Sequence, residues 1–393
     1  MFRTFWCATA LAAALAPAQA QQKDSNAFNP AISLIFQGTA ASSSQDPEAY
    51  RIDGFAPSGG EVGPAARGFS LAESELIFSA SVDPYFRAQL TAALAPEDEI
   101  EVEEAHFQTL GLGRGLTLKG GRFFSGIGYQ NETHQHAWDF QDAPLAYKAF
   151  LGGRYSDDGV QLRWVAPTDL FLELGAEFGR GASFPATERN RNGANAGSLF
   201  AHAGGDFNAS TAWRAGVSFL RASPEERAFE DDAGAVQSFT GTSRVWIADF
   251  VLKWAPNGNA TATHFKLQGE YLRTKDAGEL GFDDGIAPAS GDYASRQSGW
   301  YLQGVYQFMP RWRAGLRYDR LDRGTVETAV TTVGPLASAH NPTRVTAMLD
   351  WSGTEFSRIR LQYAEDKSRA DATDRQVLVQ YIFSLGAHGA HKF

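Results

Sequence analysis

Cysteine, long apolar runs and a basic charge balance are all lacking in this sequence. Its single cysteine, Cys7, lies within the first twenty residues, and no later apolar run reaches the roughly 18 residues of a transmembrane helix. Lysine and arginine number 35 against 45 aspartates and glutamates. These absences exclude a disulfide framework, a thiolate metal site and a transmembrane helix. The acidic balance argues against nucleic acid as a partner, because phosphate binding needs a basic face.

The N-terminus has the features of an export signal. Arg3 precedes an apolar run from Phe5 to Leu15, and Ala18 and Ala20 supply the small residues of a cleavage site. We therefore predict a signal peptide at 1–20 rather than the amphipathic helix of a cytoplasmic domain. The remaining chain has 34 basic and 45 acidic residues, a formal charge of −11, and no cysteine.

Period-two alternation of apolar and polar residues dominates the rest of the chain. Trp312, Ala314, Leu316 and Tyr318, for example, alternate with charged or small residues. Because successive strand side chains point to opposite faces, each such segment has one apolar and one polar face. Sixteen segments fit this pattern: 31–41, 70–82, 85–95, 99–110, 115–124, 158–166, 169–180, 198–208, 210–222, 244–255, 262–275, 297–308, 311–322, 342–352, 356–368 and 374–386.

The connections alternate in length. Short turns, as at 83–84 and 256–258, are followed by long polar connectors: 42–69, 125–157, 181–197, 223–243, 276–296 and 323–341. A soluble β-sandwich shows no such alternation, whereas outer-membrane barrels combine short periplasmic turns with long extracellular loops. We predict an all-β, closed antiparallel transmembrane β-barrel of about sixteen strands over 21–393, in the bacterial outer membrane and in contact with its lipid and lipopolysaccharide.

The polar rows predict a pore. Sixteen strands leave room for an aqueous lumen, and charged side chains avoid lipid because facing it is costly. The residues predicted to line it are Arg87, Arg163, Glu173, Glu177, Arg214, Asp249, Lys266, Glu270, Arg313, Arg317, Arg358 and Arg360. The pattern favours a passive channel for small hydrophilic solutes or ions over an enzyme.

Two local motifs resemble known proteins. The strand Leu116-Thr117-Leu118-Lys119-Gly120-Gly121-Arg122-Phe123, followed by Ser125-Gly126-Ile127-Gly128, resembles the phosphate-selective porin group of the porin superfamily. The tail 380–391 is similar to a less characterised bacterial branch of porin-like proteins. The resemblance implies a homotrimer and a constriction loop inside each barrel. We assign that loop to 125–150, with Tyr129, His134, His136, Trp138, Asp139 and Asp142.

Charge selectivity stays open at this stage. A phosphate channel needs a ladder of lysine and arginine, and here Glu173, Asp249 and Glu270 interrupt the predicted basic rows. We therefore carry over the porin architecture from the resemblance and leave phosphate selectivity aside.

His134 and His136 form the best metal candidate. In an extended segment two histidines at i and i+2 share one face, and Glu132, Asp139 and Asp142 offer carboxylates nearby. Nitrogen and oxygen donors of this kind suit zinc. The alternative is a polar loop whose histidines form hydrogen bonds within the constriction, with no cofactor.

The same residues argue against two other classes of outer-membrane protein. A barrel enzyme would need serine, histidine and carboxylate in a recognisable arrangement, and no local motif supplies one. A TonB-dependent receptor has 22 strands and a plug domain, whereas about ten residues precede the first predicted strand here. A solute-specific or zinc-related uptake protein remains the main alternative to a general channel.

One strand departs from strict alternation. Along 99–107, Glu104 and Phe107 break the register set by the preceding residues. A β-bulge at this point would restore the pattern. The other explanation is that the strand is misplaced.

Overall fold

The chain forms a closed antiparallel β-barrel, seen in a computed structural model that describes residues 30–59, 62–94, 100–186, 192–231 and 233–386. The barrel closes because β1 pairs with β18, from Ser33–Gly386 to Ser43–Gln376. Its strand segments are β1 Ala31–Ser43, β2 Gly68–Leu71, β3 Ser74–Ser81, β4 Phe86–Leu94, β5 Ile100–Thr109, β6 Leu116–Phe124, β7 Ser156–Val165, β8 Phe171–Gly179, β9 Ala196–Asn208, β10 Thr211–Ala222, β11 Arg227–Glu230, β12 Val236–Trp254, β13 His264–Asp283, β14 Ala289–Met309, β15 Trp312–Thr328, β16 Thr343–Thr354, β17 Ser357–Lys367 and β18 Asp374–Gly386.

Eighteen segments make sixteen barrel strands. Both β2 and β3 pair with β1, so they are two parts of one interrupted strand, and both β10 and β11 pair with β12. Each predicted strand overlaps one of the sixteen, which confirms the fold class. The predicted signal peptide at 1–20 and the tail after 386 lie outside the described residues.

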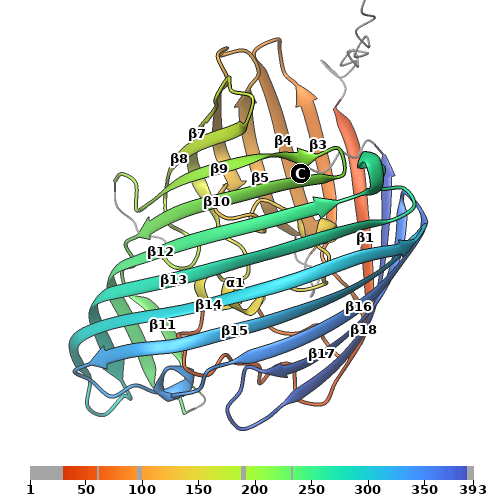
Figure 1. Cartoon of the computed structure of the whole chain (residues 1–393). Helices are drawn as coiled ribbons and strands as arrows, with labels where there is room; N and C mark the ends of the chain where they lie inside the picture. Colours follow the sequence, from red (N-terminus) through yellow and green to blue (C-terminus); the bar gives the residue numbers. More distant parts are fainter. Residues whose placement is uncertain (1–29, 60–61, 95–99, 187–191, 232, 387–393) are drawn as a thin grey trace, which may run out of the picture.

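The strands β12 to β15 are longer than the sequence predicted. They extend through most of the segment expected to be a loop at 276–296 and through part of those at 223–243 and 323–341 (Figure 1). On the lipid-facing side Trp246 and Trp254 of β12 lie eight residues apart, which is about 26 Å along a strand. That spacing matches the two aromatic girdles of an outer-membrane barrel. The strands therefore continue beyond the membrane, where the alternation of apolar and polar residues is weaker.

The predicted bulge in β5 is confirmed. In the pairing with β4, Thr91 lies opposite Glu104 and Ala92 lies opposite Val102, which leaves Glu103 as the extra residue. Two consecutive glutamates, Glu103 and Glu104, are buried as a result. A bulge that turns neighbouring side chains to one side is a common way to redirect a strand.

The segment between β6 and β7 lies inside the ring of strands. It carries the short helix α1, Leu145–Leu151, drawn in yellow within the barrel in Figure 1. Three short 3₁₀ turns lie at Gln135–Ala137, Pro256–Gly258 and Gly334–Ala337. Among the residues described, no helix is long and apolar enough to span a bilayer.

Candidate functional site: the inner loop and the lumen charges

The inner loop, defined here as Ser125–Arg154, enters the lumen through a glycine-rich turn. The carboxylate of Glu177 on β8 accepts hydrogen bonds from the Ser125 hydroxyl and the Gly126 amide. Glu270 on β13 accepts the amides of Tyr129 and Gln130 at 3.1 and 2.9 Å. Two wall carboxylates therefore fix the loop where it leaves β6.

Gly128 is required by this geometry. Its φ is +65°, a conformation that L side chains rarely adopt, and a Cβ would lie 2.5 Å from both Glu270 Oε2 and the Tyr147 hydroxyl oxygen. The Tyr147 hydroxyl itself donates to Glu270 at 2.9 Å. The same carboxylate thus holds the entry turn and the helix.

The helix α1 fills the middle of the lumen. All seven of its residues are buried, and it packs on β13, β14 and β15. The wall contributes inward apolar side chains to the same core: Leu220, Ile247, Leu272 and Leu321. A helix of two turns is not stable alone in water, so this packing holds it. This apolar patch was not predicted from the sequence, because only polar side chains were expected on the lumen face.

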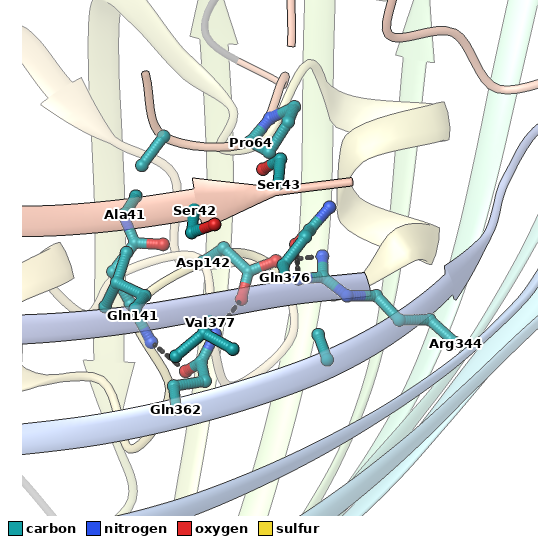
Figure 2. A pocket seen from close by; sticks show the side chains of 13 residues that line it. Ala41, Ser42, Ser43, Pro64, Gln141, Asp142, Arg344, Gln362, Gln376 and Val377 are labelled. Carbon is teal, nitrogen blue, oxygen red and sulfur yellow. Dashed lines mark hydrogen bonds and ion pairs between the residues drawn. The ribbon is translucent and has the colours of Figure 1, made fainter. Parts of the chain in front are cut away.

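Asp142 is the main ionic anchor of the loop. It pairs with Arg344 of β16, and Gln362 donates to it at 3.1 Å (Figure 2). It also pairs with Arg317 of β15 at 3.2 Å and with Lys148 of α1 at 3.4 Å. Burial opposes its charge, but Arg344, Arg317 and Lys148 hold the pKa of Asp142 well below its usual range. The carboxylate is therefore ionised at every physiological pH.

Asp139 forms a second anchor nearer the short turns. It contacts Lys266 of β13 and Arg313 of β15, each at 3.0 Å. Despite burial, these two cations lower the pKa of Asp139. The neighbouring Trp138 carbonyl accepts a hydrogen bond from Arg360 at 2.8 Å. These contacts attach the loop to the opposite side of the barrel from Glu177.

His134 and His136 face carboxylates of the wall. His136 Nδ1 lies 2.8 Å from Glu75 Oε1 of β3, and His134 Nε2 lies 2.9 Å from Glu104 Oε2 of β5. Burial disfavours a charged ring, but the carboxylates around it raise the pKa of His134 well above its ordinary value. The acidic partners differ from the expected Glu132, Asp139 and Asp142, because the loop presents the two rings to β3 and β5. Those partners are far away in sequence, and no spacing rule could have found them.

The loop leaves a cavity at the short-turn end of the lumen. Its volume is about 620 Å³, and it lies between the loop, at Tyr129 and Trp138, and the turns at 208–210 and 255–260. Four basic side chains line it: Lys253, Lys266, Arg313 and Arg358. Two acidic side chains, Asp139 and Asp206, line it as well. The cavity is therefore polar, with an excess of positive charge.

The residues predicted to line a pore divide into two groups. Seven lie on the lumen face and keep some contact with solvent: Arg87, Arg163, Glu173, Arg214, Lys266, Arg313 and Arg358. Five are buried, against the expectation that all would face water: Glu177, Asp249, Glu270, Arg317 and Arg360. Except for Asp249, which lies next to Glu270 in the wall, each of these contacts the inner loop directly. Lumen charges in this barrel therefore position the loop.

Two charged residues on the lumen face, Arg344 and Asp350, were not predicted from the sequence. Arg344 and Asp350 of β16 are buried, and so is Asp319 of β15. Asp350 joins Arg313 and Arg360 at 2.5 and 2.9 Å, and Asp319 accepts the Leu145 amide at 3.0 Å at the start of α1. Their inward alternation was visible in the sequence, but the loop residues that they hold were not.

The relationship to known proteins is decided by sequence. An uncharacterized protein of Aquifex aeolicus is 32% identical over 349 residues, which make up 83% of this chain and 70% of that protein. The chain belongs to the family of this Aquifex protein. No protein-family profile matches the chain. Family membership alone therefore leaves the transported solute open.

The fold of this chain is that of outer-membrane porins. OmpT of Vibrio cholerae with loop L8 deleted has a TM-score of 0.55 at 10% identity, covering 91% of this chain and 99% of that chain. OprB of Pseudomonas putida gives 0.54 at 12%, covering 91% and 94%. The outer-membrane channel DcaP of Acinetobacter baumannii gives 0.53 at 12%, covering 91% and 97%. The closed barrel and these neighbours place the protein in the bacterial outer membrane, while the resemblance to the phosphate-selective group stays a prediction.

Proposed function

We propose that this protein is a channel for passive diffusion of small hydrophilic solutes or ions, and that its inner loop sets the conductance. The observation that carries the proposal is the loop itself. It is anchored by buried ion pairs to charged rows on the lumen face, and it borders a polar cavity of about 620 Å³. A sheet whose interior is charged while its exterior is apolar suits water inside and lipid outside.

Planar-bilayer recording tests the channel proposal. We expect the folded full-length protein to give discrete current steps in potassium chloride, and the same preparation after heat denaturation to give none. A folded barrel that inserts into the bilayer and carries no current at any voltage would contradict the proposal.

We also propose a preference for anions. Among the residues that line the cavity, four are lysine or arginine and two are aspartate, and Asp139 is already paired with Lys266 and Arg313. An excess of one charge in a narrow passage raises the local concentration of the opposite ion. In a salt gradient the reversal potential should therefore have the sign of chloride permeation, and Arg358→Gln should shift it toward zero. A cation-selective potential in the wild type would contradict this part of the proposal.

A homotrimer is the assembly that we propose. The Vibrio cholerae OmpT neighbour is described in a trimer form, with a TM-score of 0.53. Sedimentation of the detergent-solubilised protein should give three chains per particle. A monomer at all concentrations would contradict the trimer without affecting the channel proposal.

A further inference from the structure

We propose that a divalent metal ion of the zinc type binds between the inner loop and the barrel wall, held by His134, His136 and Glu75. Glu103, the extra residue of the bulge in β5, lies beside them and would be a further ligand. The site would join the loop to β3 and β5. Metal binding does not depend on the proposed channel function, whereas its effect on current does.

The donor atoms already lie at suitable distances. One atom each from Glu75, His134 and His136 lies within 4.8 Å of the other two. His134 Nδ1 is 3.1 Å from Glu75 Oε2 and 3.6 Å from Glu103 Oε2. In a tetrahedral site with metal–ligand bonds near 2.0–2.1 Å, neighbouring ligand atoms are about 3.3 Å apart. Small side-chain rotations would therefore centre an ion among these atoms.

Three of these atoms make no hydrogen bond of good geometry among the described residues; only the ion-pair contacts of His134 with the two carboxylates join them. They are Glu75 Oε2, Glu103 Oε2 and His134 Nδ1, and all three are buried and directed toward one another. The Glu75 side chain is 0% exposed. Nearly all buried polar atoms in proteins are hydrogen-bonded, so three that converge without hydrogen bonds of good geometry indicate a place for a ligand.

The other ring nitrogen of His134 is oriented as in known metal sites. Its Nε2 lies 2.9 Å from Glu104 Oε2, so Nε2–H can donate to this carboxylate while Nδ1 faces Glu75 Oε2 and Glu103 Oε2. Metal-bound histidines usually make such an outer contact, which fixes the tautomer and the ring orientation. Glu104 would therefore act as a positioning residue rather than a ligand.

The charge around the site also calls for a cation. Four carboxylates surround it: Glu73, Glu75, Glu103 and Glu104. Arg154 balances part of their charge through ion pairs with Glu73 and Glu103. Nearby, His106 Nδ1 lies 3.9 Å from Glu104 Oε1, and Lys119 Nζ forms an ion pair with Glu132 Oε1 at 3.8 Å. Burying an unbalanced charge is costly. A protonated His134 supplies one positive charge beside these carboxylates, and a divalent ion in place of that proton would supply two.

Zinc binding to the folded full-length protein in detergent tests the proposal. His388 and His391, outside the described residues, are first replaced by alanine so that the tail cannot contribute. Calorimetric titration with zinc chloride should give one ion per chain. We expect His134→Ala and Glu75→Gln each to weaken binding at least about tenfold, because even the loss of an outer contact costs that much. X-ray absorption at the zinc edge should show two imidazole ligands.

His202→Ala is the matched control. His202 is a buried lumen histidine whose Nδ1 lies 3.0 Å from Glu173, but it has no second histidine beside it. This variant should bind zinc as the parent does. Glu75→Gln preserves the size and shape of the side chain, so it keeps the test valid if His134→Ala does not fold. Absence of zinc binding, or equal affinity in parent, His134→Ala and Glu75→Gln, would overturn the proposal.

Current recordings separate the two proposals. If both hold, zinc changes the conductance of the parent and leaves that of His134→Ala unchanged. If the protein binds zinc but carries no current, the channel proposal fails and the metal site stands. If current is present and calorimetry detects no zinc binding, the metal site fails and the channel proposal stands.

Discussion

At the scale of single residues, Asp142 carries most of the ionic attachment of the inner loop. Replacing it with asparagine would leave Arg344, Arg317 and Lys148 buried without their shared partner. Breaking a buried ion pair on one side costs roughly 3–5 kcal/mol. We expect Asp142→Asn to release the loop and expose it to limited proteolysis. Asp371→Asn, at an exposed pair with Arg369, should leave the loop protected.

The pH dependence of this contact follows from the depressed pKa of Asp142. A carboxyl group whose folded-state pKa is lowered adds stability above its unfolded pKa of about 3.9 and loses it only as pH falls through the folded value. The difference in protease sensitivity between wild type and Asp142→Asn should therefore stay constant from pH 7 to pH 5. It should still be large at pH 4. Loss of the difference with a midpoint at or above pH 4 would show that Asp142 has an ordinary pKa.

Gly128 supports a steric prediction. Gly128→Ala would place a methyl group 2.5 Å from Glu270 Oε2 at a positive φ. Overpacking and backbone strain of this kind cost roughly 1–3 kcal/mol each. Gly59→Ala is the matched control, because Gly59 has a φ of +67° and open space around its Cβ position. The loop of Gly128→Ala should be cleaved faster than that of Gly59→Ala; equal cleavage rates would contradict the steric account.

Residue roles were harder to predict than residue positions. Strand alternation predicted that Glu270 and Arg317 point into the lumen, and the spacing of His134 and His136 identified them as a pair. Glu75 and Glu104 were not predicted as partners of the histidines, because their proximity depends on how the loop crosses the lumen. Period-two patterning assigns a face to each side chain, but it carries no information on contacts between a loop and a distant strand.

At the scale of elements, α1 should depend on its apolar contacts. Leu151 is 1% exposed within the core shared by the helix and the wall. Leu151→Ala should weaken docking of the loop by about 2–5 kcal/mol, since burial is lost and a cavity remains. Limited proteolysis within 125–154 is the measurement. Leu302→Ala, on the outer face of β14, should leave loop protection unchanged, and equal cleavage in both variants would argue against helix packing.

Strand identity was predictable and strand length was not. All sixteen barrel strands were located from alternation and turn residues, and the bulge in β5 was located from one break in the pattern. The extensions of β12 to β15 were not predicted from the sequence, because these parts of the strands lie beyond the membrane. Outside lipid, a strand such as 236–245 has no need of an apolar face, and glycine and threonine remove the periodic signal.

At the scale of the whole molecule, three levels of structure depend on one another. Strands with alternating apolar and polar residues pair into a closed barrel, and the closed barrel encloses a lumen. Buried charges on the lumen face hold a loop across it. The fold follows from local sequence patterns repeated along the chain. The arrangement inside the lumen does not, because it depends on contacts between residues as far apart as Asp142 and Arg344.

The most direct test of the channel with its inner loop is single-channel recording of two proteins side by side. One is the wild type, and in the other residues 143–152 are replaced by a Gly–Ser linker of equal length. The linker keeps the chain connected while it removes α1 and its buried side chains. We expect both to give current steps, with larger steps for the linker variant. Equal conductance in two folded, inserted barrels would contradict the claim that the loop limits the passage.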